Sequence, residues 1–128
     1  MDDKKYELVP ETVTKFYSKS MYRIRALKNF SDVKKGDLGG YVESEENLSQ
    51  EGNCWIYDDS IVGSRSRVLD NAIVKDSSKV INGSEISDDA IIEKGSLIDE
   101  SSVVCDRSRV ISSLVTESSA VIYSSIVN

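Results

Sequence analysis

The chain has 128 residues, of which 39% are hydrophobic and 30% charged, and its formal net charge is −6. This length and composition predict one modest domain around a single core. No apolar run approaches the ~20 residues of a membrane-spanning helix, and the first residues, MDDKKYELVP, lack the apolar segment of a signal peptide. We therefore expect a cytoplasmic protein that does not enter the membrane.

The acidic excess lies in the second part of the chain. Residues 1–50 hold nine Asp or Glu and nine Lys or Arg, whereas residues 51–128 hold thirteen acidic and seven basic residues. Phosphate contacts dominate the affinity of proteins for nucleic acids. The acidic surface therefore argues against nonspecific binding of DNA or RNA.

Residues 1–37 are rich in aromatic side chains and come before any repeat. Two stretches, Tyr6 to Val9 and Met21 to Leu27, have the composition of strands and predict a small β-hairpin or sheet. Residues 32–40 contain three glycines and predict a turn-rich connection. Five of the nine aromatic residues of the chain lie in this segment, namely Tyr6, Phe16, Tyr17, Tyr22 and Phe30.

From residue 56 onward the sequence repeats every six residues. In steps of six, eleven of twelve positions hold a β-branched aliphatic residue, which suits a short strand with its side chain in the interior. An α-helix is excluded, because positions six apart do not stay on one face at 3.6 residues per turn. The twelve positions are Ile56, Val62, Val68, Val74, Val80, Ile86, Ile92, Ile98, Val104, Val110, Thr116 and Ile122.

The fifth position of each six-residue unit is equally regular. Ten of the twelve hold Ser or Ala, and a small residue lets the chain turn tightly at a corner. The set is Ser60, Ser66, Ala72, Ser78, Ser84, Ala90, Ser96, Ser102, Ser108, Leu114, Ala120 and Ile126.

This pattern resembles the hexapeptide-repeat left-handed β-helix, in which three units make one triangular coil. The predicted fold is all-β: a single-stranded left-handed parallel β-helix of about five triangular coils with a small N-terminal β cap. The left hand is implied by the resemblance alone, since crossovers between parallel strands are usually right-handed. Because the ends of a solenoid need covering, residues 1–37 are expected to be the capping segment and residues 38–128 the β-helix.

The repeat also predicts where each coil begins. Eighteen residues before Ile56 lies Leu38, so the first coil is expected to start there in the same phase, with Leu48 and Cys54 at fifth positions. The predicted coils are 38–55, 56–73, 74–91, 92–109 and 110–127. In the last coil, Leu114 and Ile126 are large where other coils have small residues, and they either plug that end or stack on another copy.

Several outward positions are apolar and predict a contact surface, because exposed apolar patches usually mark interfaces. We expect this surface to form a homo-oligomer, either a dimer or a trimer. A host protein or protein complex is also an expected partner. The residues expected on it are Trp55, Tyr57, Ile73, Ile91, Val103, Cys105, Val121, Tyr123, Leu114 and Ile126.

The chemistry of the enzymes that share the resembled architecture is absent. Hexapeptide-repeat acyltransferases and carbonic anhydrases rely on histidine, and this chain has none. The acidic pairs at predicted corners, such as Asp58 with Asp59, are expected to be turn residues, and Cys54 and Cys105 are expected to be free thiols. We therefore predict no catalytic residues, no metal and no cofactor.

A short motif, Arg-Ser-Arg-Val, occurs twice at a spacing of 42 residues. Because 42 is not a multiple of 18, the two copies are expected on different faces. They are candidates for anion contacts, although ion pairing with nearby acids is the alternative. The arginines are Arg65, Arg67, Arg107 and Arg109.

The stretch from Tyr22 to Ser60, YRIRALKNFSDVKKGDLGGYVESEENLSQEGNCWIYDDS, resembles the N-terminal segment of phage and prophage hexapeptide-repeat β-helix proteins. The resemblance implies a phage origin and the host cytoplasm. The leading hypothesis is a non-catalytic accessory protein that binds a host macromolecule, such as an inhibitor of CRISPR or another host defence system. A degenerate acyltransferase and a structural virion component are the alternatives.

Overall fold

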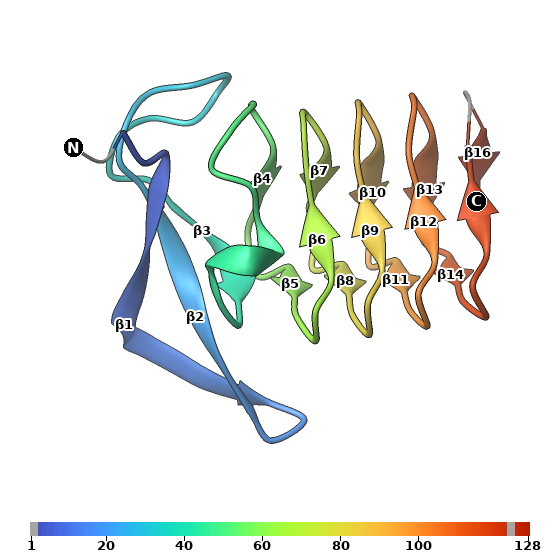
Figure 1. The fold of residues 1–128 in the computed structure, drawn as a ribbon, viewed down its shortest axis with the longest axis horizontal. Coiled ribbons are helices and arrows are strands. Elements are labelled where there is room, and N and C mark those ends of the chain that lie inside the picture. Colours follow the sequence, from blue (N-terminus) through green and yellow to red (C-terminus); the bar gives the residue numbers. More distant parts are fainter. Residues whose placement is uncertain (1–2, 123–124) are drawn as a thin grey trace.

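The structure of the chain, a computed structural model, describes residues 3–122 and 125–128 (Figure 1). Nearly all regular structure is β, in two long strands followed by many short ones and one 3-10 turn, η1 (Glu45–Asn47). The strands are β1 (Tyr6–Phe16), β2 (Lys19–Ala26), β3 (Leu38–Val42), β4 (Trp55–Ile56), β5 (Ile61–Val62), β6 (Arg67–Val68), β7 (Ile73–Val74), β8 (Lys79–Val80), β9 (Glu85–Ile86), β10 (Ile91–Glu93), β11 (Leu97–Ile98), β12 (Val103–Val104), β13 (Arg109–Ile111), β14 (Leu114–Val115), β15 (Ala120–Val121) and β16 (Ile126–Val127).

The strands from β3 onward wind into a parallel β-solenoid of about five coils, which confirms the predicted all-β class. Each later coil contributes one strand to each of three sheets, whereas the first coil contributes strands to two of them and an isolated bridge at Leu48 to the third. The coils stack in chain order along the long axis (Figure 1). The sheet orders are β1-β2-β3-β5-β8-β11-β14, β16-β13-β10-β7-β4 and β15-β12-β9-β6. None of the described helices is long and apolar enough to cross a membrane.

The core is a stack of aliphatic side chains in the centre of the coils. In the regular coils the second residue of each short strand points inward and is fully buried, as Val62, Val80 and Ile98 show along one sheet. The first residue of the same strand points outward. Burying one such side chain contributes about 1.5–3 kcal/mol to the stability of the fold. The six-residue period of the sequence therefore corresponds to the spacing of the core residues.

The buried serines have a second role beyond small size. Along two of the three corners, each serine hydroxyl accepts a hydrogen bond from the backbone N–H of the matching residue one coil later. The Ser84 Oγ, for example, accepts from the Ser102 nitrogen at 3.2 Å. These hydroxyl ladders satisfy buried backbone donors that would otherwise cost free energy.

The predicted register of the first coil is wrong. Val42 pairs with Val62, and Leu48 pairs with Val68, each a step of 20 residues, whereas Ile56 pairs with Val74, a step of 18. Two additional residues therefore lie in the turn between Leu48 and Ile56, so Leu48 is an inward strand residue. Leu38, which the repeat placed in the interior, is 53% exposed.

The last coil is one residue shorter than the repeat predicts. Ile98 pairs with Val115 and Val104 pairs with Val121, each a step of 17. The turn after Val110 has lost a residue, which moves every later position by one. Leu114 and Ile126 are therefore not corner residues that plug the coil: both begin strands, point outward and are 60% and 66% exposed.

The N-terminal hairpin joins the solenoid edge to edge. Strand β2 pairs antiparallel with β1 and with β3, and β3 pairs parallel with β5, so one sheet runs from the hairpin into the coils. Gly40 permits this junction, because a Cβ atom there would lie 2.4 Å from the Ser60 carbonyl oxygen. A side chain at this position would push the first coil away from the second.

We predict that Ser84→Ala destabilises the fold by about 1 kcal/mol, because it removes a buried acceptor for the Ser102 N–H while keeping a small residue at the corner. Thermal unfolding followed by circular dichroism measures the loss as a lower Tm. Ser87→Ala is the matched control, since the Ser87 hydroxyl makes no hydrogen bond with the described residues. Equal Tm values for the two variants would contradict a stabilising role for the ladder.

Candidate functional site

A polar pocket lies where the hairpin meets one corner of the solenoid. It has a volume of about 440 Å³ and is lined by Lys19, Glu43, Ser64, Arg65 and Asn82, which we call the corner pocket. Lys19 begins β2 and Glu43 follows β3, so the pocket combines residues of the hairpin sheet with turns of two successive coils. A smaller hollow of about 300 Å³ continues from it and shares Glu43 and Arg65.

Glu43 organises the floor of the corner pocket. Its Oε1 accepts a hydrogen bond from the Ser64 backbone nitrogen at 2.9 Å, and its Oε2 lies 3.6 Å from the Lys19 Nζ. The Ser64 carbonyl in turn accepts from the Gly83 nitrogen, beside Asn82. These contacts fix the turn that carries Arg65.

Arg65 is the basic residue of this site that is not in an ion pair with the described residues. It lies at φ 65° in the left-handed region, as do turn residues at many other corners of the solenoid. Its side chain is exposed, lines both hollows and makes no ion pair or hydrogen bond with the described residues. A guanidinium with five free donors is well suited to bind a phosphate or a carboxylate.

The other predicted anion contacts have different surroundings. Arg67 on β6 lies 3.1 Å from the Glu85 carboxylate, and Arg109 on β13 pairs with Glu93, whose side chain is 4% exposed. These two arginines therefore form ion pairs, the alternative that the sequence left open. Strands β6 and β13 belong to different sheets, which confirms that the two motifs lie on different faces. Arg107 is exposed in a turn.

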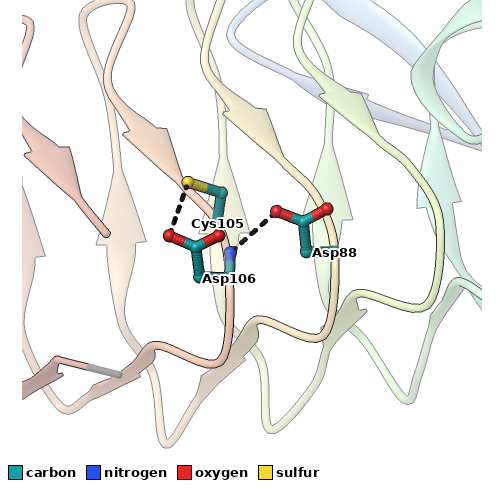
Figure 2. Close-up of side chains that lie close together, drawn as sticks. All are labelled: Asp88, Cys105 and Asp106. Carbon is teal, nitrogen blue, oxygen red and sulfur yellow. Dashed lines mark hydrogen bonds between the residues drawn. The ribbon is translucent and has the colours of Figure 1, made fainter. Parts of the chain in front are cut away.

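Asp88, Cys105 and Asp106 form a second cluster at another corner, shown in Figure 2. Their ligand atoms lie within 4.8 Å of one another. Asp88 Oδ2 accepts a hydrogen bond from the Asp106 nitrogen at 2.9 Å, and Asp70 accepts in the same way from the Asp88 nitrogen. These acids thus connect turns of successive coils, as expected for turn residues.

Burial and charge also act on the thiol of this cluster. Partial burial, and then the neighbouring carboxylates of Asp106 and Asp88, raise the pKa of Cys105. The raised pKa favours the protonated form of this thiol.

A buried cluster joins the hairpin to the first coil. The Lys5 Nζ donates to the Cys54 carbonyl oxygen at 2.8 Å and lies 3.3 Å from the Cys54 Sγ. Lys5 is 1% exposed and Cys54 is fully buried. Burial lowers the pKa of Lys5 and raises the pKa of Cys54, and each shift favours the uncharged form. Both cysteines are free thiols, as predicted.

Two residues predicted on the contact surface are in fact buried. Trp55 is 2% exposed, because Tyr6 and Phe30 of the N-terminal segment pack edge-on against its ring. Val121 is 7% exposed, because the shortened last coil turns it inward.

The remaining predicted surface residues differ in exposure. Val103, Leu114 and Ile126 are exposed, whereas Tyr57, Ile73, Ile91 and Cys105 are half-buried. Tyr57 also donates a hydrogen bond from its hydroxyl to Asp32 at 2.6 Å. Tyr123 lies outside the described residues.

No family model matches the chain. Over 47 residues it is 43% identical to the uncharacterized acetyltransferase YdcK of Escherichia coli strain K12, a match that covers 37% of this chain. The matched part covers 14% of YdcK, so the chain spans about a seventh of the length of that relative. The partial match and the β-solenoid fit a hexapeptide-repeat β-helix family, and a phage origin stays a prediction.

This match corrects one prediction. The absence of histidine led us to expect a protein that is not an enzyme, but the relative bears the name of an acetyltransferase. The missing side chain excludes one general base and does not exclude acyl transfer, since carboxylates also accept protons.

The sequence did not single out Lys19, Glu43, Asn82 or Lys5. A usable signal existed for one of them: Asn82 lies 18 residues after Ser64, one coil away at the same corner. The other three belong to or adjoin the hairpin, whose placement against the coils has no periodic signature.

We predict that stability falls as the pH rises above about 10.5. Burial raises the pKa of Tyr6 above the ordinary tyrosine value of 10.0, and burial with the Asp32 contact raises that of Tyr57. The folded protein keeps these protons where the unfolded chain loses them, so alkaline pH favours unfolding. Above 10.5, the ordinary lysine value, Lys5 no longer opposes this trend.

Urea unfolding at a series of alkaline pH values measures this effect. Tyr6→Phe should reduce the slope of stability against pH, whereas Tyr17→Phe, at a tyrosine that is 81% exposed, should leave it unchanged. A slope that Tyr6→Phe does not alter would show that Tyr6 ionises equally in both states.

Proposed function

We propose that the protein binds a phosphate-bearing acyl donor of the acyl-coenzyme A type in the corner pocket and takes part in acyl transfer. The observation that carries the proposal is Arg65, an exposed guanidinium that lines the corner pocket and makes no ion pair or hydrogen bond with the described residues. The name of the partial relative supports the choice of an acyl donor.

The residues around Arg65 suit such a ligand. Lys19 adds a second positive charge to the lining of the pocket, and Asn82 and Ser64 add neutral polar groups. Bidentate arginine contacts and a lysine charge are common means of holding phosphate groups. The ligand would displace water from the exposed ends of these side chains.

Glu43 gives the pocket a proton acceptor. In acyl transfer an amine or hydroxyl attacks the thioester carbonyl, loses its proton, and the coenzyme leaves as a thiol. Glu43 is the carboxylate that lines both hollows, and the backbone N–H of Ser64 fixes its position. It therefore serves in this proposal as the general base that histidine supplies elsewhere.

Isothermal titration calorimetry with acetyl-coenzyme A tests the proposal. We expect measurable binding by the intact chain and an affinity at least about tenfold weaker for Arg65→Ala, because a charge-assisted hydrogen bond contributes about 1.5–3 kcal/mol. Arg107→Ala is the matched control, since Arg107 is an exposed arginine in a turn at another corner. No heat of binding, or equal losses in both variants, would overturn the proposal.

A second candidate function is association with another protein. Val103, Leu114 and Ile126 are exposed apolar side chains on the last two coils, one on each of the three sheets, and they support a contact at this end of the solenoid. We propose either a homo-oligomer or a host protein as the partner. Inhibition of a host defence system, such as CRISPR, in the cytoplasm of a phage host remains the most specific form of this proposal.

Analytical ultracentrifugation and a pull-down from host lysate test the second candidate. We expect Leu114→Glu combined with Ile126→Glu to abolish a self-association or a stoichiometric capture that the intact chain shows. The control is Tyr17→Glu, an exposed aromatic position at the hairpin turn. A monomer that captures no stoichiometric partner would contradict this function.

A further inference from the structure

The contact between Lys5 and Cys54 is unusual for a buried pair. Lys5 Nζ donates to two carbonyl oxygens, those of Gly52 at 3.3 Å and Cys54 at 2.8 Å, and lies 5.2 Å from the centre of the Phe30 ring. Its other close neighbour is the Cys54 sulfur at 3.3 Å. Among the described residues, no carboxylate pairs with Lys5 Nζ, although a carboxylate is the usual partner of a buried lysine.

This environment favours a neutral amine beside a neutral thiol. Burial of a charge without a counterion is costly, and the group responds by losing its charge. A neutral lysine has a free electron pair on nitrogen and is a nucleophile. The structure therefore holds a nucleophilic nitrogen in contact with an oxidisable sulfur.

A hollow adjoins Lys5 on the outside of the cap, while the Cys54 side chain behind it is fully buried. This hollow has a volume of about 550 Å³ and is lined by Lys5, Phe30, Gln50 and Gly52, among others. Gly52 contributes the carbonyl that binds the Lys5 Nζ, so the wall of the hollow adjoins the Lys5 and Cys54 contact. A small oxidant such as a peroxide can enter a hollow of this size.

We propose that Lys5 and Cys54 form an oxidative modification site, at which a peroxide joins the lysine nitrogen covalently to the cysteine sulfur. The Lys5 amine accepts the Cys54 proton across the 3.3 Å contact, and the resulting thiolate attacks the peroxide. The O–O bond breaks, the released hydroxide takes the proton back from Lys5, and sulfenic acid and water form. The Lys5 amine then attacks that sulfur, an S–N bond forms, and the hydroxyl group leaves with the amine proton as water. Sulfur is oxidised by two electrons and the peroxide is reduced by two.

The crosslink would join the first strand of the cap to the first coil. Residues around Cys54 already enclose this part of β1, because Gln50 Oε1 accepts from the Lys5 nitrogen at 2.7 Å and the Leu48 carbonyl accepts from the Tyr6 hydroxyl at 2.6 Å. A covalent bond would hold the start of the hairpin permanently against the first coil, where polar contacts now hold it. Reduction by a thiol would release it, because a thiol attacks the S–N sulfur.

Peptide mapping by mass spectrometry after treatment of the full chain with hydrogen peroxide tests the proposal. We expect a linked pair of peptides that contains Lys5 and Cys54 and weighs two hydrogens less than the separate peptides. Dithiothreitol should separate them, and the oxidised protein should have a Tm several degrees higher, as for other crosslinks that close a long loop. Cys105, which is less buried, is the internal control for peroxide exposure.

Lys5→Arg is the matched variant, because the guanidinium keeps a long side chain with N–H donors but stays protonated and does not attack sulfur. In this variant, dimedone should label Cys54 as a free sulfenic acid and no linked peptide should form. If the variant does not fold, the map of the unaltered protein decides by itself. Cys105 oxidised while Lys5 and Cys54 remain in separate peptides would overturn the proposal.

Discussion

The parallel hydrogen bonding between one coil and the next is the constraint on which the whole structure depends. A short strand of two residues has little stability alone, and here each strand inside a sheet pairs with the strand of the coil before it and with that of the coil after it. That pairing requires each inward residue to lie directly over its predecessor, so the interior accepts only side chains of similar size. The aliphatic stack, the small corner residues and the acids of the turns all follow from this requirement.

The hydroxyl ladders show how the corners meet the same requirement. Where the preceding coil has Ser, its hydroxyl accepts a hydrogen bond from the backbone N–H of the matching residue in the next coil. Where the preceding coil has Ala, as at Ala72, the matching N–H uses another acceptor, and the Ala90 N–H donates to the Ser87 carbonyl. The choice between Ser and Ala is therefore a choice between two ways of satisfying a buried donor. From the sequence alone, Ser and Ala at these positions can be recognised only as small residues.

The fold was predictable because its period is short and repeated many times. The ten inward positions from Ile56 to Val110 were correctly identified, since a β-branched aliphatic residue recurs at every one of them. The register failed where a turn gained two residues before Ile56 and lost one after Val110, because a fixed step of six cannot detect a change confined to one turn. The large residue at Leu114 was the available sign of the second change.

The candidate site was less predictable for a physical reason. Arg65 was visible as part of a motif, but the pocket exists only because the hairpin brings Lys19 and Glu43 to that corner. The contact of Lys5 with Cys54 likewise spans 49 residues and has no counterpart in the repeat. Contacts between the non-repeating N-terminal segment and the repeating coils can be identified only from the structure.

The shortened turn between Val110 and Leu114 has a consequence for how such a chain can change in length. A lost residue there leaves the inward stack intact, since Val115, Val121 and Val127 still align with the coil before. Single-residue insertions and deletions are thus tolerated at corners, while the strands tolerate only the gain or loss of complete coils. A solenoid of this kind can therefore lengthen by duplication of one coil at a time. Such a change in length leaves the outward-facing residues of the other coils unaltered.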